Sequence, residues 1–510
     1  MTPRKPLAQS PAFLATLAAV GLAPFFYFTL TRYIDLDFWY DELTTLLLYA
    51  CVPLKKTVTD YSFPNNHVFS NIANNLFLRL VGLHDVGDVV QAPWAARALM
   101  LLYACLFLLL LFLVARRLWG GLYGVFCAVT AGTTIPFYNF ATQVRGYVLS
   151  MTLLAAALWC LTGYAARRRA ASLLGLTLSG ALLLYTIPVN LYALFALGLY
   201  CGGRALGAYI RRAPDRAVWR NAALALCLSV ALACLFYAPV LHEVLGNRFV
   251  TSQGLFATAT LTETAPRMLG FLLSERLYLL PVVAAGLGLA LFSPRLRPPF
   301  LGLFLVLVAT PFLLSFARGD AVMYRLYVNL VGPFALLVTA CLRAVCGLDA
   351  LKRREAGVVG LLTAAMALSF VFAVRGLERT WAADIADGTR NMDTYDNWHQ
   401  AFYGTRDVVA LLRAGGLAGS APVSVMKRDV DELSMPWRLE RAGIAHTVCE
   451  DDACLRFGPD GRALVVTGFP AVAQARLGRA FPGLSCRLLT PTPRFHNVLE
   501  CALPQPLPQP

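Results

Sequence analysis

The sequence predicts an α-helical membrane protein with many spans that ends in a small C-terminal α/β domain. Of its 510 residues, 58% are hydrophobic and 14% are charged, and its mean hydropathy is +0.60. Soluble domains carry roughly a quarter charged residues, so this composition excludes a water-soluble protein. The net charge of +15 arises wholly before Arg375, because residues 375–510 hold 15 basic and 15 acidic side chains. A basic surplus confined to the apolar part is typical of a membrane protein and not of a nucleic-acid binder.

Eleven apolar runs approach the roughly 20 residues that a helix needs to cross a bilayer. They lie at about 11–30, 93–115, 120–137, 146–165, 171–187, 189–207, 221–240, 277–293, 299–316, 326–346 and 356–374. Some runs are short or separated only by a turn, as on either side of Pro188, so a count that differs by one pair stays open. The predicted transmembrane domain covers residues 1–374, and residues 375–510 form the predicted soluble domain.

The basic residues of alternate loops predict which way the chain crosses the membrane. One set of loops holds 18 basic and 3 acidic residues, whereas the other set holds 11 of each. This asymmetry predicts a multi-pass protein of the plasma (inner) membrane, with a cytoplasmic N-terminus. For an odd number of spans, the C-terminal domain is then periplasmic or extracellular. The first run has a basic start but no convincing cleavage site, so we expect an uncleaved span and not a secretory signal.

The first predicted outer loop, residues 31–92, is too long for a plain turn and too amphipathic for a disordered link. Apolar side chains recur with helical spacing within residues 43–50 and again within residues 68–80. This spacing predicts short helices that lie on the membrane surface.

An acidic cluster of Asp35, Asp37, Asp41 and Glu42 begins five residues after the first run. Carboxylates at a membrane border, among aromatic residues, are candidates for catalysis. Asp41 and Glu42 also open the first predicted surface helix, so capping and a favourable interaction with the helix dipole would explain them equally simply.

The C-terminal domain alternates predicted helices and strands, which indicates a small α/β domain. We expect helices at 407–414, 430–442 and 471–480, and extended segments at 423–426, 463–467, 484–489 and 497–502. No GxGxxG or Walker pattern occurs in the sequence, so no nucleotide loop is predicted.

Four of the thirteen cysteines lie in this C-terminal domain, which is predicted to face an oxidising space. Two disulfides are favoured over a zinc site in that environment. The simplest pairing joins Cys449 to Cys454 and Cys486 to Cys501, and closeness in sequence is its only support.

Five short segments of the predicted membrane domain combine charged and aromatic residues near the outer ends of spans. They are Tyr40-Asp41-Glu42, Asn65-Asn66-His67, Arg97, Gln143-Val144-Arg145-Gly146-Tyr147 and Met323-Tyr324-Arg325. Together they resemble membrane-embedded GT-C glycosyltransferases, and above all the bacterial members of glycosyltransferase family 39. That group includes protein mannosyltransferases and the lipid A aminoarabinose transferase. Many of its members carry His-Pro-Pro where this chain has His67-Val68-Phe69, which leaves the role of His67 open.

The resemblance implies a GT-C fold and a glycosyltransferase. Its donor would be a polyprenyl-phosphate sugar, and its acceptor an extracytoplasmic lipid, glycan or protein, attacked by single displacement. The implied catalytic residues are Asp41 and Glu42. The implied donor-phosphate ligands are Arg97, Arg145 and Arg325, and the implied substrate-binding residues are Asn66, His67, Tyr147 and Tyr324.

The chemistry of these side chains agrees with such a reaction. A carboxylate can accept the proton of the attacking group, and a guanidinium can stabilise the negative charge on a departing phosphate. Two residues adjacent on a helix point about 100° apart, so only one of Asp41 and Glu42 should face the cavity. Arginines at this depth also serve as anchors that reach up to the membrane surface, which is the alternative for each of the three.

A polytopic transporter or lipid flippase without glycosyl transfer is the alternative function. Such proteins usually show inverted repeats and ionisable groups near the membrane midplane, whereas the charges here gather at the outer border. A scaffold without catalytic activity is a third possibility. We expect the lipid bilayer and a polyprenyl-phosphate sugar as partners, no nucleic acid, no divalent metal, and a monomer or weak oligomer.

Overall fold

The computed structural model describes residues 10–63, 65–246, 256–257, 269–270, 272–274, 276–318, 321–322, 324–387, 404–414, 416–427, 434–491 and 496–504. The chain forms two compact units. The first, here called the membrane unit, contains residues 1–31, 48–85 and 95–373. The second, here called the C-terminal unit, contains residues 32–47, 86–94 and 374–510, so it includes two segments of the first loop.

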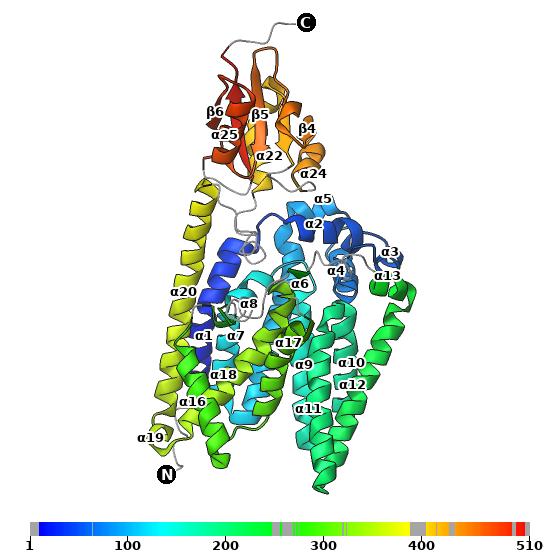
Figure 1. Cartoon of the computed structure of the whole chain (residues 1–510), viewed down its shortest axis with the longest axis vertical. Helices are drawn as coiled ribbons and strands as arrows, with labels where there is room; N and C mark the ends of the chain where they lie inside the picture. The colour runs from blue at the N-terminus through cyan, green and yellow to red at the C-terminus, as the bar shows by residue number, and fades with distance from the viewer. Residues whose placement is uncertain are drawn as a thin grey trace. The chain divides into compact units, whose positions relative to one another are not determined.

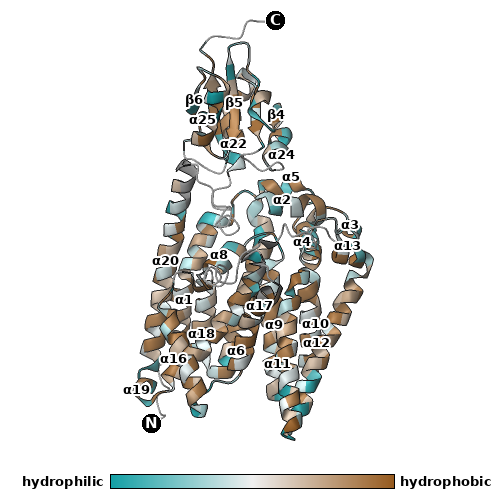
Figure 2. Cartoon of the chain, in the orientation of Figure 1, coloured by the Kyte–Doolittle hydropathy of each residue, from teal (hydrophilic) through white to brown (hydrophobic). Residues whose placement is uncertain are grey.

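Seven helices in the described part are long and apolar enough to cross a membrane. These are α1 (Pro11–Phe28), α6 (Pro93–Trp119), α9 (Tyr147–Arg167), α11 (Leu191–Ile210), α12 (Arg216–Tyr237), α18 (Val331–Cys346) and α20 (Glu355–Asp387), some of them extended by short flanking turns. Figure 2 shows apolar residues along most of their length. The prediction of a polytopic helical membrane protein is therefore confirmed.

Four shorter apolar elements occupy the remaining predicted runs. They are α7 (Gly121–Gly132), α10 (Ala170–Thr186), α16 (Leu279–Phe292) and α17 (Leu301–Arg318). Each coincides with a run in the sequence, but the apolar stretch of each is shorter than the seven long helices, so the count of eleven spans stays a prediction.

The predicted run 120–137 is not one helix, because α7 ends at Gly132 and a second helix, α8 (Ile135–Phe140), begins after a break. The hydroxyl of Thr134 caps α8 by accepting a hydrogen bond from the backbone N–H of Phe137 at 3.2 Å. Pro136 lies in the first turn of α8, where its missing N–H costs nothing. The continuous apolar run hid this capped break.

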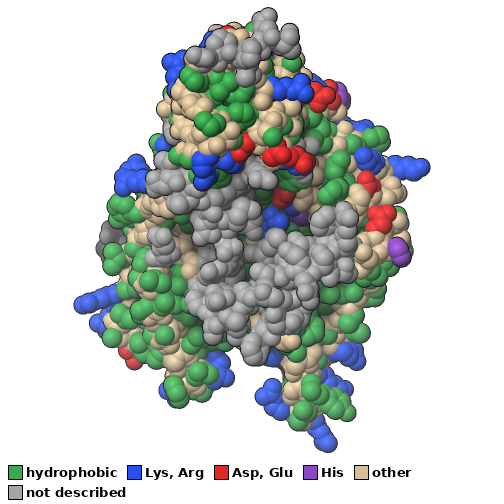
Figure 3. Space-filling view, turned by 45° about the horizontal axis from the view of Figure 1, so that its top comes forward, with side chains coloured by type: hydrophobic (Ala, Val, Ile, Leu, Met, Phe, Trp, Pro, Cys, Tyr) green, Lys and Arg blue, Asp and Glu red, His purple; other side chains and the backbone are tan. Residues whose placement is uncertain are grey.

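The helices of the membrane unit pack in two groups (Figure 1). One group consists of α9, α10, α11 and α12, and the other consists of α1, α7, α16, α17 and α18, with α11 packing against α17. Among the seven long helices α18 is the most enclosed, with 89% of its most apolar 18-residue stretch buried. Figure 3 shows Lys and Arg side chains around the helix ends on the side of α19 (Asp349–Lys352).

The first loop contributes α2 (Tyr40–Thr45), which continues as a π-turn from Leu46 to Ala50, then α3 (Leu54–Thr59), α4 (Val68–Leu80) and α5 (Val86–Gln91). Helix α4 matches the predicted surface helix. Two short strands, β1 (Phe256–Ala257) and β2 (Ala321–Val322), pair antiparallel in the loops that follow α12 and α17.

The C-terminal unit contains a five-stranded sheet in the order β4-β3-β5-β7-β6. Its strands are β3 (Val423–Met426), β4 (His446–Cys449), β5 (Arg462–Thr467), β6 (Ser485–Leu488) and β7 (Asn497–Ala502). β3 pairs parallel with β4 and β5, whereas β7 pairs antiparallel with β5 and β6. The predicted α/β domain is confirmed, with β4 as a strand that the sequence prediction missed.

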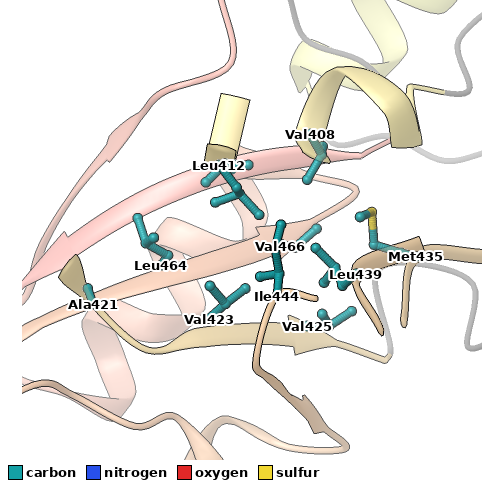
Figure 4. Packing of buried hydrophobic residues seen from close by; sticks show 11 residues of the cluster. Val408, Leu412, Ala421, Val423, Val425, Met435, Leu439, Ile444, Leu464 and Val466 are labelled. Atoms are coloured by element: carbon teal, nitrogen blue, oxygen red, sulfur yellow. The ribbon is translucent and has the colours of Figure 1, made fainter. Parts of the chain in front are cut away.

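Helices α22 (Thr405–Ala414) and α24 (Ser434–Arg441) pack on this sheet, and α25 (Pro470–Ala480) packs against a second core cluster. Val408 and Leu412 of α22 and Leu439 of α24 meet Val423 and Val466 of the sheet in a closed apolar cluster (Figure 4). Residues 430–433 of the second predicted helix lie outside the described residues.

Two disulfides are present in the C-terminal unit. One joins Cys449 at the end of β4 to Cys454, and the other joins Cys486 of β6 to Cys501 of β7. Cys486 and Cys501 lie directly opposite each other in the antiparallel ladder. These are the two pairs that closeness along the sequence predicted.

Candidate functional site

A buried polar cluster in the membrane unit joins the start of α4 to the segment before α9. The Arg145 guanidinium donates from Nη2 to Oδ1 of Asn65 at 2.9 Å, and the same nitrogen lies 3.5 Å from Nε2 of His67. The backbone N–H of Gly146 donates to Nδ1 of His67 at 2.8 Å. His67 is 3% exposed and Arg145 is 2% exposed. Two segments nearly 80 residues apart therefore form one enclosed group.

Gly146 is required for this close approach. A Cβ atom at this position would lie 2.7 Å from Cγ2 of Thr186 and 2.9 Å from Cβ of His67. Tyr147 follows and closes one side, because its ring centre is 5.3 Å from the His67 ring and 5.3 Å from Cζ of Arg145. The predicted residues His67, Arg145 and Tyr147 thus touch one another.

The hydrogen bond from Gly146 determines which nitrogen of His67 carries the proton in the neutral ring. Because Nδ1 accepts, the proton resides on Nε2, the nitrogen nearest Arg145. Burial lowers the pKa of His67 well below its usual value, and the charges of Arg145 and Arg325 lower it further. Two neighbouring donors, a neutral imidazole N–H and a guanidinium, can share one anionic oxygen such as that of a phosphate.

This protonation state predicts a dependence of stability on pH. The unfolded chain binds more protons than the folded chain below the ordinary histidine pKa of about 6.5, so stability should fall as the pH drops through that value. The thermal midpoint of the wild type, measured at about pH 7.5 and at about pH 5.5, should decrease more than that of His67→Gln. Equal decreases in both proteins would show that His67 is not held neutral.

Arg97 and Arg325 complete the set of predicted phosphate ligands. Arg97 is fully buried near the start of α6. Arg325 is partly exposed in a 3-10 turn from Tyr324 to Leu330, and its charge acts on His67. Buried arginines cannot be anchors that reach to the surface, so that alternative does not apply to Arg97 or Arg145. The side chain of Tyr324 lies outside what the structure describes.

Asparagines hold the loop that presents His67. Asn66 donates from Nδ2 to the carbonyls of Thr57 at 2.9 Å and Asp60 at 2.6 Å, and its Oδ1 accepts from Asn71 at 3.0 Å. Asn75 donates to the carbonyls of Ala50 and Val52 at 2.8 and 2.6 Å. The amide of Asn66, predicted as a substrate ligand, is thus engaged within the loop. Asn71 and Asn75 were not predicted as functional residues. Their i, i+4 spacing, which places them on one face of a helix, is the signal that could have identified them.

Arg276 is a buried arginine that the sequence reasoning did not select. It donates to the carbonyl of Thr130 at 3.1 Å and to Oγ1 of Thr133 at 2.9 Å, at the carboxyl end of α7. A cation there interacts favourably with the helix dipole. Its Nη2 is buried without a hydrogen-bond partner among the described residues. No sequence pattern distinguished Arg276 from other loop arginines.

The predicted acidic pair belongs to the C-terminal unit. Glu42 is fully buried, and its Oε2 accepts from the backbone N–H of Trp39 at 3.4 Å, as in a capping box. Asp41, 7% exposed, lies in the same first turn of α2. The capping role predicted for the pair therefore applies to Glu42.

Asp37 organises the C-terminal unit. Its carboxylate accepts from Oγ1 of Thr405 at 2.9 Å and from the backbone N–H of Arg406 at 2.6 Å, at the start of α22. It also pairs with Nε of Arg406 at 2.6 Å and with Nη2 of Arg438 at 3.2 Å. This buried side chain therefore ties residues 32–47 to both α22 and α24.

Asp37→Asn should therefore destabilise the C-terminal unit. Removing one partner of a buried ion pair costs about 3–5 kcal/mol, and we expect the lower end because Arg406 is partly exposed. Asp35→Asn is the matched control, since Asp35 is exposed and pairs with Arg406 at 3.6 Å, a contact worth up to about 1 kcal/mol. Limited proteolysis during heating measures both. A similar shift in the two variants would contradict the central role of Asp37.

The described residues contain no group of three or more His, Cys, Asp or Glu side chains that could hold a metal ion. The membrane unit offers a set of cationic and neutral donors, and the C-terminal unit offers a carboxylate pair.

Comparison with solved structures identifies the architecture. The structure is similar to the crystal structure of ArnT from Cupriavidus metallidurans in the apo state, with 14% identity, a TM-score of 0.55, and coverage of 96% of this chain and 98% of that chain. The same protein bound to undecaprenyl phosphate gives 15% identity, a TM-score of 0.55, and coverage of 98% and 100%. This chain has the GT-C fold. The architecture implied by the five sequence segments is thereby confirmed.

A cryo-EM structure of the arabinofuranosyltransferase AftD from Mycobacteria also matches, with 15% identity, a TM-score of 0.43, and coverage of 97% of this chain and 40% of that chain. No protein-family model matches the sequence, and no curated protein matches it.

Proposed function

We propose that this GT-C protein is a membrane glycosyltransferase that moves a sugar from a polyprenyl-phosphate carrier to an extracytoplasmic acceptor. The observation that carries the proposal is the enclosed pair of Arg145 and His67, two donors 3.5 Å apart in a membrane-embedded unit. The similar ArnT structure bound to undecaprenyl phosphate supports a carrier of this kind.

The leaving group sets the electrostatic requirement. In a single displacement the acceptor oxygen or nitrogen bonds to the anomeric carbon while the bond from that carbon to the phosphate oxygen breaks. The electron pair departs with the phosphate, so negative charge grows on it. Arg145, with Arg97 and Arg325, supplies positive charge to stabilise this anion, and the Arg145 guanidinium can hold two phosphate oxygens in one plane.

The attacking group must lose a proton, which we assign to Asp41. A positioned carboxylate raises the rate by accepting the proton of the acceptor hydroxyl or amine as the new bond forms. Glu42 is occupied at the start of α2, where it accepts from Trp39. Direct displacement by the acceptor inverts the configuration at the anomeric carbon, so product stereochemistry reports on the mechanism.

The orientation of the chain is part of this proposal. In it the N-terminus is cytoplasmic and the C-terminal unit lies outside the inner membrane. The basic residues around the α19 end of the membrane unit support this orientation (Figure 3). An alkaline phosphatase reporter fused after Pro510 should be active, and one inserted within residues 167–169 should be inactive. The reverse pattern would remove the proposed reaction from the outer face.

The test of the function compares the glycans and glycolipids of a deletion strain with those of the wild type. Loss of one sugar from one glycoconjugate, restored by the wild-type gene, would identify donor and acceptor together. Unchanged glycoconjugates, with carrier lipid accumulating in one leaflet, would instead indicate a flippase.

A further inference from the structure

The C-terminal unit contains an open pocket of about 710 Å³ that is lined by α5, α22 and α24. This volume is within the range of sites that bind small molecules, roughly 300–1,000 Å³. Its lining includes Arg406 and Arg413 of α22, and Trp437, Arg438 and Arg441 of α24. We infer that this pocket binds an acidic saccharide, a sugar ring that carries a carboxylate or a phosphate.

The charge of the pocket selects an anion. Four guanidinium groups line it, and none of its lining residues is acidic. Asp37 pairs with Arg406 and Arg438, and Asp35 also pairs with Arg406, so these two carboxylates balance the charges of these two arginines. Arg413 and Arg441 add two more positive charges to the lining. Asp88 of α5 is exposed and is not part of the lining. Arginine matches the planar geometry of carboxylate and phosphate, which a lysine does not.

Trp437 gives the pocket a flat apolar surface next to these cations. Cζ of Arg438 lies 6.0 Å from its ring centre, and Cζ of Arg441 lies 5.9 Å from it. The indole is partly exposed in the described structure. An aromatic ring offers a large, rigid contact surface, which suits the C–H face of a pyranose, while the adjacent guanidinium groups suit an acidic substituent on that ring.

Gly87 positions one of these cations. A Cβ atom on Gly87 would lie 1.5 Å from Nη2 of Arg441, so the guanidinium rests directly against the backbone of α5. Gly87→Ala must therefore displace the end of the Arg441 side chain. This variant moves a charge without removing it, and it distinguishes a placed guanidinium from one that merely adds to a positive surface.

The inference goes beyond the proposed function, because binding to this pocket requires neither the donor nor sugar transfer. If the deletion strain shows no loss of sugar, the proposed function fails while the pocket remains to be judged by binding. If transfer is found but the pocket binds no acidic sugar, only this inference fails.

The experiment is calorimetric titration of the full-length protein in detergent. The probes are methyl glucuronide for the carboxylate source, glucose 6-phosphate for the phosphate source, and methyl glucoside and inorganic phosphate as the two halves of the ligand. At least one acidic sugar should bind about tenfold or more tightly than both halves, as expected for a charge-assisted hydrogen bond. Which acidic sugar binds more tightly identifies the source of the negative charge.

Arg441→Gln and Trp437→Leu should each weaken that binding about tenfold, and Gly87→Ala should weaken it without loss of a charge. Arg479→Gln, at an exposed arginine of α25 outside the pocket, is the matched control and should bind as the wild type does. Thermal midpoints show whether each variant is folded.

Several results would overturn the inference. The first is binding of methyl glucoside or of inorganic phosphate as tight as that of the acidic sugars. The second is tighter binding of uridine monophosphate, an acidic nucleotide, than of glucose 6-phosphate. The third is no measurable binding of either acidic sugar. Undiminished binding in the folded Gly87→Ala and Arg441→Gln variants would also overturn it.

Discussion

Asp41→Asn is expected to lower sugar transfer by roughly 10²–10⁴-fold, the contribution of a positioned base, while the protein still folds and inserts. The amide keeps the size of the carboxylate and most of its hydrogen bonding, but it cannot take up a proton at neutral pH. The measurement is transfer by purified protein at saturating donor and acceptor. Binding of the polyprenyl-phosphate sugar should stay near the wild-type level, because the proposed phosphate ligands are arginines.

Glu42→Gln is the matched control for Asp41→Asn. Its Oε2 accepts from the backbone of Trp39, and an amide oxygen can still accept that hydrogen bond. We expect a smaller loss of transfer and, if the cap weakens, a loss of stability of about 1 kcal/mol. Full transfer in Asp41→Asn, or a loss in Glu42→Gln as large as in Asp41→Asn, would count against Asp41 as the base.

Arg145→Ala is expected to have the second large effect, a loss of transfer of roughly 10²–10³-fold together with weaker donor binding. The change removes positive charge where the departing phosphate develops negative charge. It also leaves Asn65 without the donor that reaches it at 2.9 Å. The transfer rate and donor affinity of Arg145→Lys should lie between those of the wild type and Arg145→Ala, because lysine keeps the charge and loses the planar pair of donors.

Arg116→Ala is the matched control for Arg145→Ala, because Arg116 is exposed near the end of α6. It should transfer sugar at the wild-type rate. The Arg145 charge also lowers the pKa of His67, so Arg145→Ala should reduce the loss of stability on acidification. Unchanged donor affinity in Arg145→Ala would mean that this arginine only braces Asn65 and His67.

Much of the architecture followed from the sequence because hydropathy and helix periodicity are local properties. Most of the apolar runs between 11–30 and 356–374 are long enough to indicate their helices, whatever their neighbours are. The two disulfide pairs were likewise the nearest cysteines along the chain. Where a local signal was ambiguous, as at Thr134, the continuous apolar run concealed a capped break between α7 and α8.

Some of the candidate site residues could likewise be predicted from local motifs, and others could not. Arg145 and His67 were selected by short motifs, but only folding brings Gly146 and Arg145 of one segment against His67 of another. Asn71 and Arg276 carry no motif, because their roles are hydrogen bonds to a loop and to a helix end that other parts of the chain supply.

Asp37 shows most clearly what could not be predicted from the sequence. In the sequence it is one of four clustered carboxylates, and nothing local separates it from Asp35. In the fold it is buried and binds Arg406 and Arg438, which lie more than 360 residues away, whereas Asp35 stays exposed. Composition and spacing determined the helices and the candidate residues. The tertiary structure decided which carboxylates are structural and where the arginines gather, because ion pairs and burial depend on contacts that are distant along the chain.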